Sequence, residues 1–208
     1  MSVKSFFGDE ASRRVAGAIR ELERSSSAEV VVAVRASSGH YRHVDYLVGA
    51  LLLFAGLLVF IFHPAPFRID VFPLEALALF VGGALLSAWL PPLRRALASP
   101  RLLADNVRTA ARAAFVELGI GSTSARTGLL VFVSTLERRV EVVADTGVIR
   151  AARGPDWNGA IARLAQAVES DPELGRFVDA LGGLGQVLER ALPARPDDVN
   201  ELPDQVQS

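Results

Sequence analysis

The chain has 208 residues, with 22 Lys and Arg against 23 Asp and Glu, a net charge of −1 and a pI near 6.3. This balance gives no basic face for phosphates, so we expect no nucleic-acid partner. The lack of cysteine excludes disulfides, thiolate metal sites and a cysteine nucleophile. The mean hydropathy of +0.31 is high for a soluble protein, and the apolar excess lies within residues 46–90.

The chain begins with a predicted helix followed by a predicted strand. Across residues 9–25, Val15, Ile19 and Leu22 recur at helical spacing on one face. The segment Glu29–Arg35 is a nearly continuous run of β-branched residues. Such a run is typical of a strand that is covered on both faces.

Two long apolar runs come next. Residues 46–62 carry no charge, residues 71–90 carry only Glu75, and a short linker, 63–70, joins them. Helices of these lengths reach roughly 25 and 30 Å at about 1.5 Å per residue, close to the hydrocarbon thickness of a bilayer. We therefore expect a transmembrane helical hairpin over residues 46–92. The alternative is a helical hairpin buried in a soluble core.

The second half of the chain returns to a globular pattern. A helix is expected from near Leu93 or Pro100 to about Leu118, followed by strands at residues 128–134 and 139–145. The short link between these two strands predicts an antiparallel pair. The long crossover from the first strand of the chain predicts a parallel pair.

The closing segments are helical and then irregular. Apolar residues recur at helical spacing between residues 157 and 188, and the polar tail 194–208 is expected to be extended. The whole pattern predicts an α/β fold, a small mixed β-sheet flanked by helices on both faces. Its domain is discontinuous, residues 1–45 and 93–193, because the hairpin is inserted between the first and second strands.

Arginine is distributed unevenly around the two apolar runs. Arg35 and Arg42 precede the first run, and four arginines follow the second run between residues 94 and 108. The linker carries Arg68 alone, offset by Asp70. The positive-inside rule therefore predicts an inner-membrane protein with two spans and both termini in the cytoplasm.

Few residues offer catalytic chemistry. The histidines His40, His43 and His63 lie outside the predicted globular core, so a Ser-His-Asp triad has no obvious base. The sequence contains no Walker loop, no GxGxxG after a strand and no His-Glu-x-x-His helix.

Carboxylates remain as candidate site residues. Glu29 opens the first strand, Asp145 ends the third strand, and Asp156 precedes a helix. Strand ends and the loops beside them are where α/β sheets place their sites, and hard cations such as Ca²⁺ and Mg²⁺ take oxygen ligands. These three residues are therefore a candidate metal site. The alternative is structural: a turn residue, a helix cap and a partner for an arginine.

Four segments of the chain resemble the TPM domain family, also described as TPM phosphatases. They are residues 23–34, 126–134, 137–148 and the acidic stretch 197–204. The resemblance implies a compact α/β sandwich and, in a bacterial membrane branch, a transmembrane hairpin inserted after the first strand. Some members of the family are associated with acid phosphatase activity and divalent cations, and others with the assembly or maturation of membrane complexes.

The resemblance also implies which residues form the site. Glu29 and Asp145 fall within the matching segments, with Asp156 as a neighbour. After the third strand this chain reads Ala-Asp-Thr-Gly, residues 144–147, and lacks a rich acidic cluster. We therefore expect an accessory or scaffold protein that binds a membrane-associated partner; the alternative is a divalent-cation-dependent phosphatase at the cytoplasmic membrane face.

Overall fold

The structure is a computed structural model that describes residues 8–64, 68–169, 173–195 and 201–202. The chain forms two compact units. One is continuous, residues 39–103, and is called the hairpin unit below. The other combines residues 1–38 with residues 104–208 and is called the globular unit. The hairpin unit extends further at both ends than the predicted insertion.

A three-stranded mixed sheet forms the centre of the globular unit, in the order β1-β2-β3. β1 (Glu29–Arg35) pairs in parallel with β2 (Gly128–Ser134), and β2 pairs antiparallel with β3 (Arg139–Ala144). Both predicted pairings are confirmed. β3 ends one residue earlier than predicted, because Asp145 begins the next element as a helix cap.

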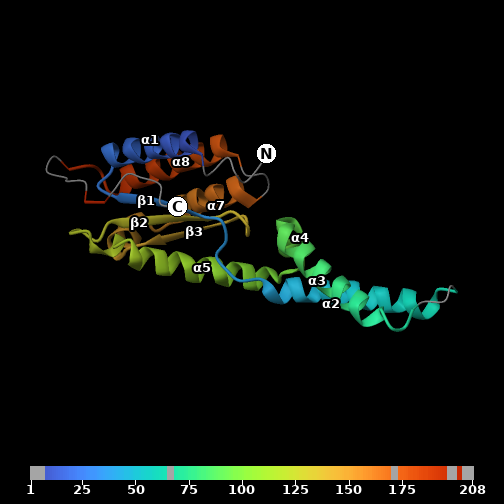
Figure 1. Cartoon of the computed structure of the whole chain (residues 1–208). Coiled ribbons are helices and arrows are strands. Elements are labelled where there is room, and N and C mark those ends of the chain that lie inside the picture. Colours follow the sequence, from blue (N-terminus) through green and yellow to red (C-terminus); the bar gives the residue numbers. More distant parts are fainter. Residues whose placement is uncertain (1–7, 65–67, 170–172, 196–200, 203–208) are drawn as a thin grey trace. The chain divides into compact units, whose positions relative to one another are not determined.

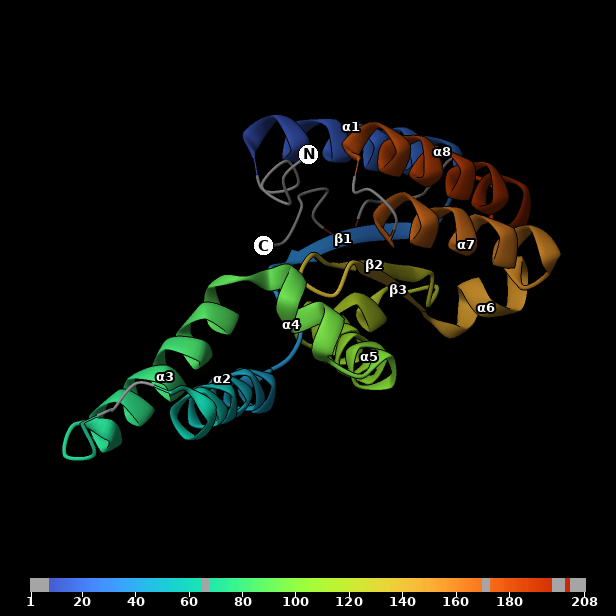
Figure 2. The same ribbon diagram turned by 90° about the vertical axis from the view of Figure 1, so that its right-hand side faces the viewer.

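Helices cover both faces of this sheet, as the continuous apolar strands predicted (Figures 1 and 2). One face packs against helices from both ends of the chain: α1 (Asp9–Ser25), α6 (Thr146–Ala152), α7 (Pro155–Glu169) and α8 (Leu174–Ala191). The other face packs against α5 (Pro100–Glu117) and the short 3₁₀ helix η2 (Ile120–Ser122). Alternate residues of β1 and β2 point into the two cores, which is the two-residue period of a strand.

Two helical segments differ from the prediction. The short helix α4 (Pro91–Leu97) was not predicted; its first turn holds the two prolines, where a missing N–H costs nothing. The helix expected from near Leu93 or Pro100 to about Leu118 is α5, which begins at Pro100 and ends at Glu117. The seven-residue α6 was not predicted.

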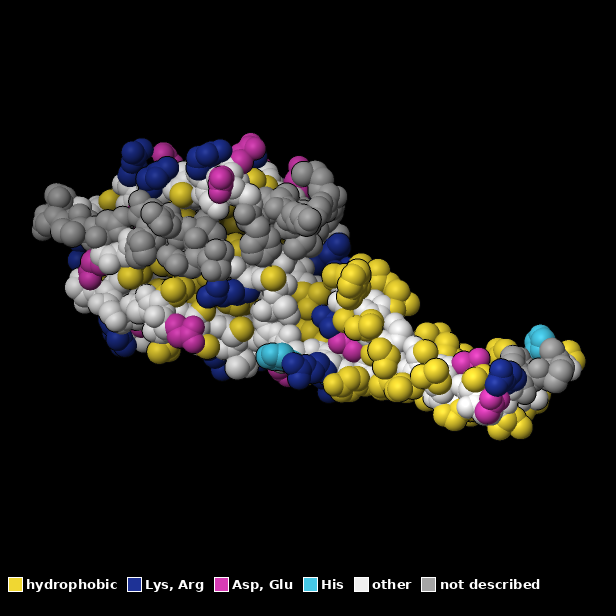
Figure 3. All heavy atoms as spheres, in the orientation of Figure 1, with side chains coloured by type: hydrophobic (Ala, Val, Ile, Leu, Met, Phe, Trp, Pro, Cys, Tyr) yellow, Lys and Arg dark blue, Asp and Glu magenta, His cyan; other side chains and the backbone are white. Residues whose placement is uncertain are grey.

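The hairpin unit contains two long apolar helices. α2 (Arg42–Phe62) has 21 residues, of which the most apolar 18 have a mean hydropathy of 2.4, and α3 (Phe72–Trp89) has 18 residues and a mean hydropathy of 1.6. By length and composition, both could cross a membrane. Hydrophobic side chains cover much of their visible surface (Figure 3).

A glycine contact joins α2 to α3. A Cβ atom added at Gly49 of α2 would lie 2.6 Å from the carbonyl oxygen of Phe80 in α3. A Cβ atom added at Gly83 would lie 3.0 Å from the Cα of Gly49. The two backbones approach this closely because neither position carries a side chain.

Candidate functional site

Glu29 and Asp145 lie at the same end of the sheet, on either side of Gly128. Glu29 is the register partner of Gly128 in β2, and the N–H of Asp145 donates to the Gly128 carbonyl at 2.9 Å. Both acids are 7% exposed. At this end β1 and β2 begin and β3 ends, so the topology brings together two of the three predicted site residues.

Asp145 has two carboxylate oxygens in different surroundings. Its Oδ1 accepts a hydrogen bond from the Thr146 N–H at 2.6 Å, which caps α6. Its Oδ2 is buried and accepts no hydrogen bond among the described residues. That oxygen lies 3.3 Å from Nε of Arg126, so the two side chains form an ion pair without hydrogen-bond geometry.

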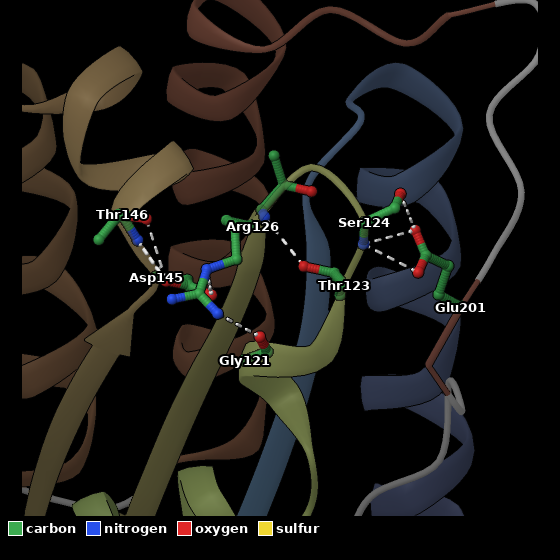
Figure 4. Close-up of polar contacts among 8 residues, drawn as sticks. Gly121, Thr123, Ser124, Arg126, Asp145, Thr146 and Glu201 are labelled. Carbon is green, nitrogen blue, oxygen red and sulfur yellow. Dashed lines mark hydrogen bonds and ion pairs between the residues drawn. The ribbon is translucent and has the colours of Figure 1, made fainter.

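Arg126 adopts an uncommon backbone conformation. Its φ is +59°, in the left-handed region that non-glycine residues seldom occupy. Its side chain also donates to the Gly121 carbonyl at 3.1 Å, and its own carbonyl accepts from the Gly147 N–H at 2.9 Å. These contacts fix the loop between η2 and β2 over the end of the sheet (Figure 4).

The loop can approach the sheet because β2 begins with glycine. A Cβ atom added at Gly128 would lie 2.0 Å from the carbonyl oxygen of Ile120. Any side chain there would push η2 away, and with it the loop that carries Arg126. The glycine between the two acids therefore has a steric role.

The C-terminal residues Glu201 and Leu202 also contact this end of the sheet. The Glu201 carboxylate accepts from both the N–H and the hydroxyl of Ser124, at 3.0 and 2.7 Å (Figure 4). The N–H of Leu202 donates to Oε2 of Glu29 at 3.3 Å. The sequence predicted an extended tail, and two of its residues, Glu201 and Leu202, lie against the globular unit in no helix or strand; residues 196–200 and 203–208 of that tail lie outside the described residues.

Asp156 does not join the other two acids. It lies in the first turn of α7 and pairs with Arg190 of α8, at 3.1 Å between Oδ2 and Nη2. Within the described ranges, no group of three or more His, Cys, Asp or Glu residues is placed to hold a metal ion. Asp145 caps α6, whereas the structural alternative of the sequence analysis made it a turn residue; the metal site stays a prediction.

A second polar cluster lies where β1 and β2 end. Glu137 is buried in the turn between β2 and β3. One of its carboxylate oxygens accepts from the Ser38 N–H at 2.9 Å and the Ser37 hydroxyl at 3.3 Å, and the other accepts from the Ser134 hydroxyl. A buried carboxylate with this many donors is satisfied, and it ties the segment after β1 to the β2–β3 turn.

The third polar cluster belongs to the hairpin unit. The Asp45 carboxylate in α2 accepts two hydrogen bonds from Arg94 of α4 in a bidentate arrangement, from Nε at 2.8 Å and from Nη2 at 2.5 Å. The hydroxyl of Ser87, fully buried in α3, donates to the same carboxylate at 2.8 Å. The hydrogen bonds to Asp45 raise the pKa of Arg94, so the arginine stays charged. We call these three residues the polar clasp.

Comparisons with known proteins add a fold and no family. No family model matches the chain, and no curated protein matches it either. Among solved structures, the NMR structure of the BA42 protein from the psychrophilic bacterium Bizionia argentinensis sp. nov. matches with a TM-score of 0.58. The match covers 96% of this chain and 93% of that one, at 14% sequence identity. A likeness at that identity supports a shared mixed α/β fold and says nothing of activity.

Sequence reasoning missed the residues that the tail and the clasp bring together. Ser124 was not singled out, and Glu201 was named only as part of the polar tail and of the acidic stretch 197–204. Neither Asp45 nor Ser87 was singled out as a site residue. A weak signal existed for the clasp, since Ser87 interrupts an apolar run and Arg94 follows it closely.

Proposed function

We propose that the chain is a membrane-anchored protein with a TPM-like globular unit, acting as an accessory or scaffold factor for a membrane-associated partner. In this proposal α2 and α3 span the inner membrane and both termini are cytoplasmic. The observation that carries the proposal is the exposed apolar surface of these two helices. Of the most apolar 18 residues in each helix, only 17% in α2 and 11% in α3 are buried.

This exposure separates the membrane reading from the soluble-core alternative. A core helix of a soluble protein has its apolar side chains covered, whereas Phe54, Ile61 and Leu77 are more than half exposed. Soluble proteins seldom leave continuous apolar surface of this size open to water. A bilayer removes the free-energy cost of exposing this apolar surface to water, because its hydrocarbon core is about as thick as these helices are long.

The polar clasp fits the same proposal. Asp45 lies in the first turn of α2, and Ser87 lies in the last turn of α3. Both therefore lie at the open end of the hairpin, away from the linker, at the level where the positive-inside rule places the cytoplasmic headgroups. A charge pair there can reach polar surroundings, whereas the middle of each span carries no charge.

Extraction of membranes tests the anchor. We expect the chain to stay in the pellet after alkaline carbonate and after high salt, and to be released by detergent. Release by carbonate alone would rule out the anchor. A protease-accessible tag in the linker should be cut from outside the cell, and a tag at the N-terminus should be protected.

Purification with the partner tests the accessory role. An N-terminally tagged chain, solubilised in mild detergent, should recover a second membrane protein at a constant ratio over repeated preparations. A chain in which residues 46–92 are scrambled in order but unchanged in composition is the control for contacts made by detergent-exposed helices. Recovery of the chain alone, in every detergent tested, would contradict the accessory role.

A second candidate function is a divalent-cation-dependent phosphatase. The observation that favours it is the buried Oδ2 of Asp145, at the same sheet end as Glu29. This oxygen accepts no hydrogen bond among the described residues, and its charged neighbour is Arg126, with Nε 3.3 Å away. An oxygen in that state is one that Mg²⁺ or Ca²⁺ could take as a ligand.

Activity of the purified chain tests this second candidate. The substrate is a generic phosphate monoester, with Mg²⁺ or Ca²⁺ at millimolar concentration. The second candidate requires turnover that is lost in Asp145→Asn and kept in Asp105→Asn, a charge-matched change on the exposed surface of α5. An absence of turnover, together with a melting temperature that neither cation raises, would rule it out.

A further inference from the structure

The contact of the tail with the globular unit is made by two consecutive residues through three different kinds of interaction. The Glu201 carboxylate accepts from the N–H and hydroxyl of Ser124. The Leu202 N–H donates to Glu29. The Leu202 side chain is partly buried against the α5 core, with Phe115 and Leu118.

Each of these three interactions selects a different property of the bound segment. The donor pair on Ser124 selects an acceptor, and a charged carboxylate forms stronger hydrogen bonds there than a neutral amide. The apolar contact selects an aliphatic side chain at the next position. The buried carboxylate of Glu29 accepts a backbone N–H, which fixes the direction of the segment and excludes proline at the second position.

The surface that receives the segment is built by other parts of the chain. The Ser124 N–H and hydroxyl come from the η2–β2 loop, which its own glycine contact and the Arg126 contacts hold in place. Glu29 is held by its position at the start of β1. The apolar part belongs to a core that α5 and the sheet build between them. The site is therefore formed by residues far from the tail in sequence, 77 and 173 positions away in the two hydrogen-bonded pairs.

We propose that this surface is a peptide-binding site for a segment with glutamate followed by leucine, and that the chain's own Glu201–Leu202 occupies it in the free protein. Ser124 and Glu201 are both exposed, so the contact can open without unfolding the unit. An acidic-aliphatic segment of a partner would then bind by displacing the tail. The proposal does not depend on the membrane anchor or on any catalytic activity.

Binding of the tail peptide in trans tests the site. The probe is a fluorescent peptide of residues 197–208, and the receptor is the detergent-solubilised chain truncated after Arg195. We expect saturable binding to the truncated chain, at least tenfold weaker binding to the full chain, and a single peptide bound per chain. The full chain binds more weakly because its tethered tail competes at an effective concentration near the millimolar range.

Two pairs of matched variants test the assignment of residues. Ser124→Ala in the receptor should weaken binding at least fivefold, whereas Ser122→Ala, the same change in the adjacent 3₁₀ helix, should leave it unchanged. Glu201→Gln in the peptide should weaken binding at least fivefold. Asp204→Asn removes the same charge three positions later and should have little effect.

Several outcomes would overturn the proposal. Absence of saturable binding to the truncated chain, with its melting curve unchanged, would remove the site. Equal weakening by Glu201→Gln and Asp204→Asn would mean that the peptide is held by its net charge alone. A full chain that forms dimers only when its tail is intact would mean that the tail occupies the site of a second copy.

Discussion

Two ion pairs of the hairpin unit have the same shortest separation, 2.5 Å, but opposite burial. In the polar clasp the side chains of Arg94 and Asp45 are 26% and 9% exposed, whereas Arg68 and Asp70 in the linker are 77% and 63% exposed. An exposed pair is screened by water and is seldom worth a measurable amount. A buried pair leaves an uncompensated charge when one partner is removed.

The clasp is therefore where a charge-removing substitution should matter. We expect Asp45→Asn to lower the free energy of unfolding in detergent by about 1–3 kcal/mol, because Arg94 loses its counter-ion and Ser87 loses a charged acceptor. Asp70→Asn, the same chemical change in the linker, should leave the thermal unfolding midpoint unchanged. Equal effects of the two substitutions would contradict a role for burial.

The left-handed backbone at Arg126 allows a different residue-scale prediction. Arg126→Ala and Arg126→Gly both remove the contacts with Asp145 and Gly121. Glycine populates positive φ without a steric penalty, so we expect Arg126→Gly to be more stable than Arg126→Ala by about 1 kcal/mol. Chemical denaturation of the two variants measures this difference; alanine at least as stable as glycine would show that the loop relaxes out of this conformation.

At the residue scale, the sequence indicated some of the site residues but not the residues that they contact. Glu29 and Asp145 were predicted at strand ends, and the register then placed them on either side of Gly128. Asp45 accepts from Ser87, 42 positions away, and Glu137 accepts from Ser38, 99 positions away, so no local pattern connects these pairs. Such pairs appear only once helix ends and turns are placed in space.

At the scale of elements, the packing of α2 on α3 depends on glycine. A Cβ atom at Gly49 would approach a backbone carbonyl to 2.6 Å, and backbone cannot rotate away as a side chain can. A Cβ atom at Gly82 meets nothing within 4 Å. The two positions therefore provide a test and its control within one hairpin.

We expect Gly49→Ala to destabilise the hairpin by about 1–3 kcal/mol, because α2 and α3 must move apart to admit the methyl group. Gly82→Ala should be neutral or stabilising by up to about 1 kcal/mol, since alanine favours the helix. Denaturation in detergent, followed by helical circular dichroism, measures both changes. Similar destabilisation by the two substitutions would mean that the close approach of the helices is not maintained.

Element boundaries followed from the sequence where a run of one residue type was long. The strands Glu29–Arg35 and Gly128–Ser134 were predicted at their observed bounds, because continuous β-branched and aliphatic runs end there at charged or polar residues. Helix α6 was missed because its seven residues complete barely two turns, too few for a periodic signal. Its cap, Asp145, looked instead like the last residue of a strand.

At the scale of the whole molecule, the globular unit is assembled from two segments that the hairpin unit separates in sequence. β1 lies before the insertion, and the parallel partner β2 lies after it. The core on the α1 side joins residues from both segments, and Glu137 joins Ser37 and Ser38 across the same break. The discontinuous domain was predictable from strand order, because a parallel pair requires a crossover and the hairpin lies within it.

This assembly predicts that the globular unit folds without the hairpin unit. The change is replacement of residues 39–103 by a long Gly/Ser linker, which leaves both cores and the Glu137 contacts in place. The linker closes a loop at a small cost in free energy, since each doubling of its length adds only about 0.6 kcal/mol of loop-closure entropy. We expect a chain that is soluble without detergent and unfolds in one cooperative transition, measured by circular dichroism and calorimetry.

Linkers of two lengths control for strain at the joins. A chain that stays aggregated or unfolds without cooperativity at both lengths would show that the two units fold only together, and the hairpin unit would then be part of the fold and not an insertion into it.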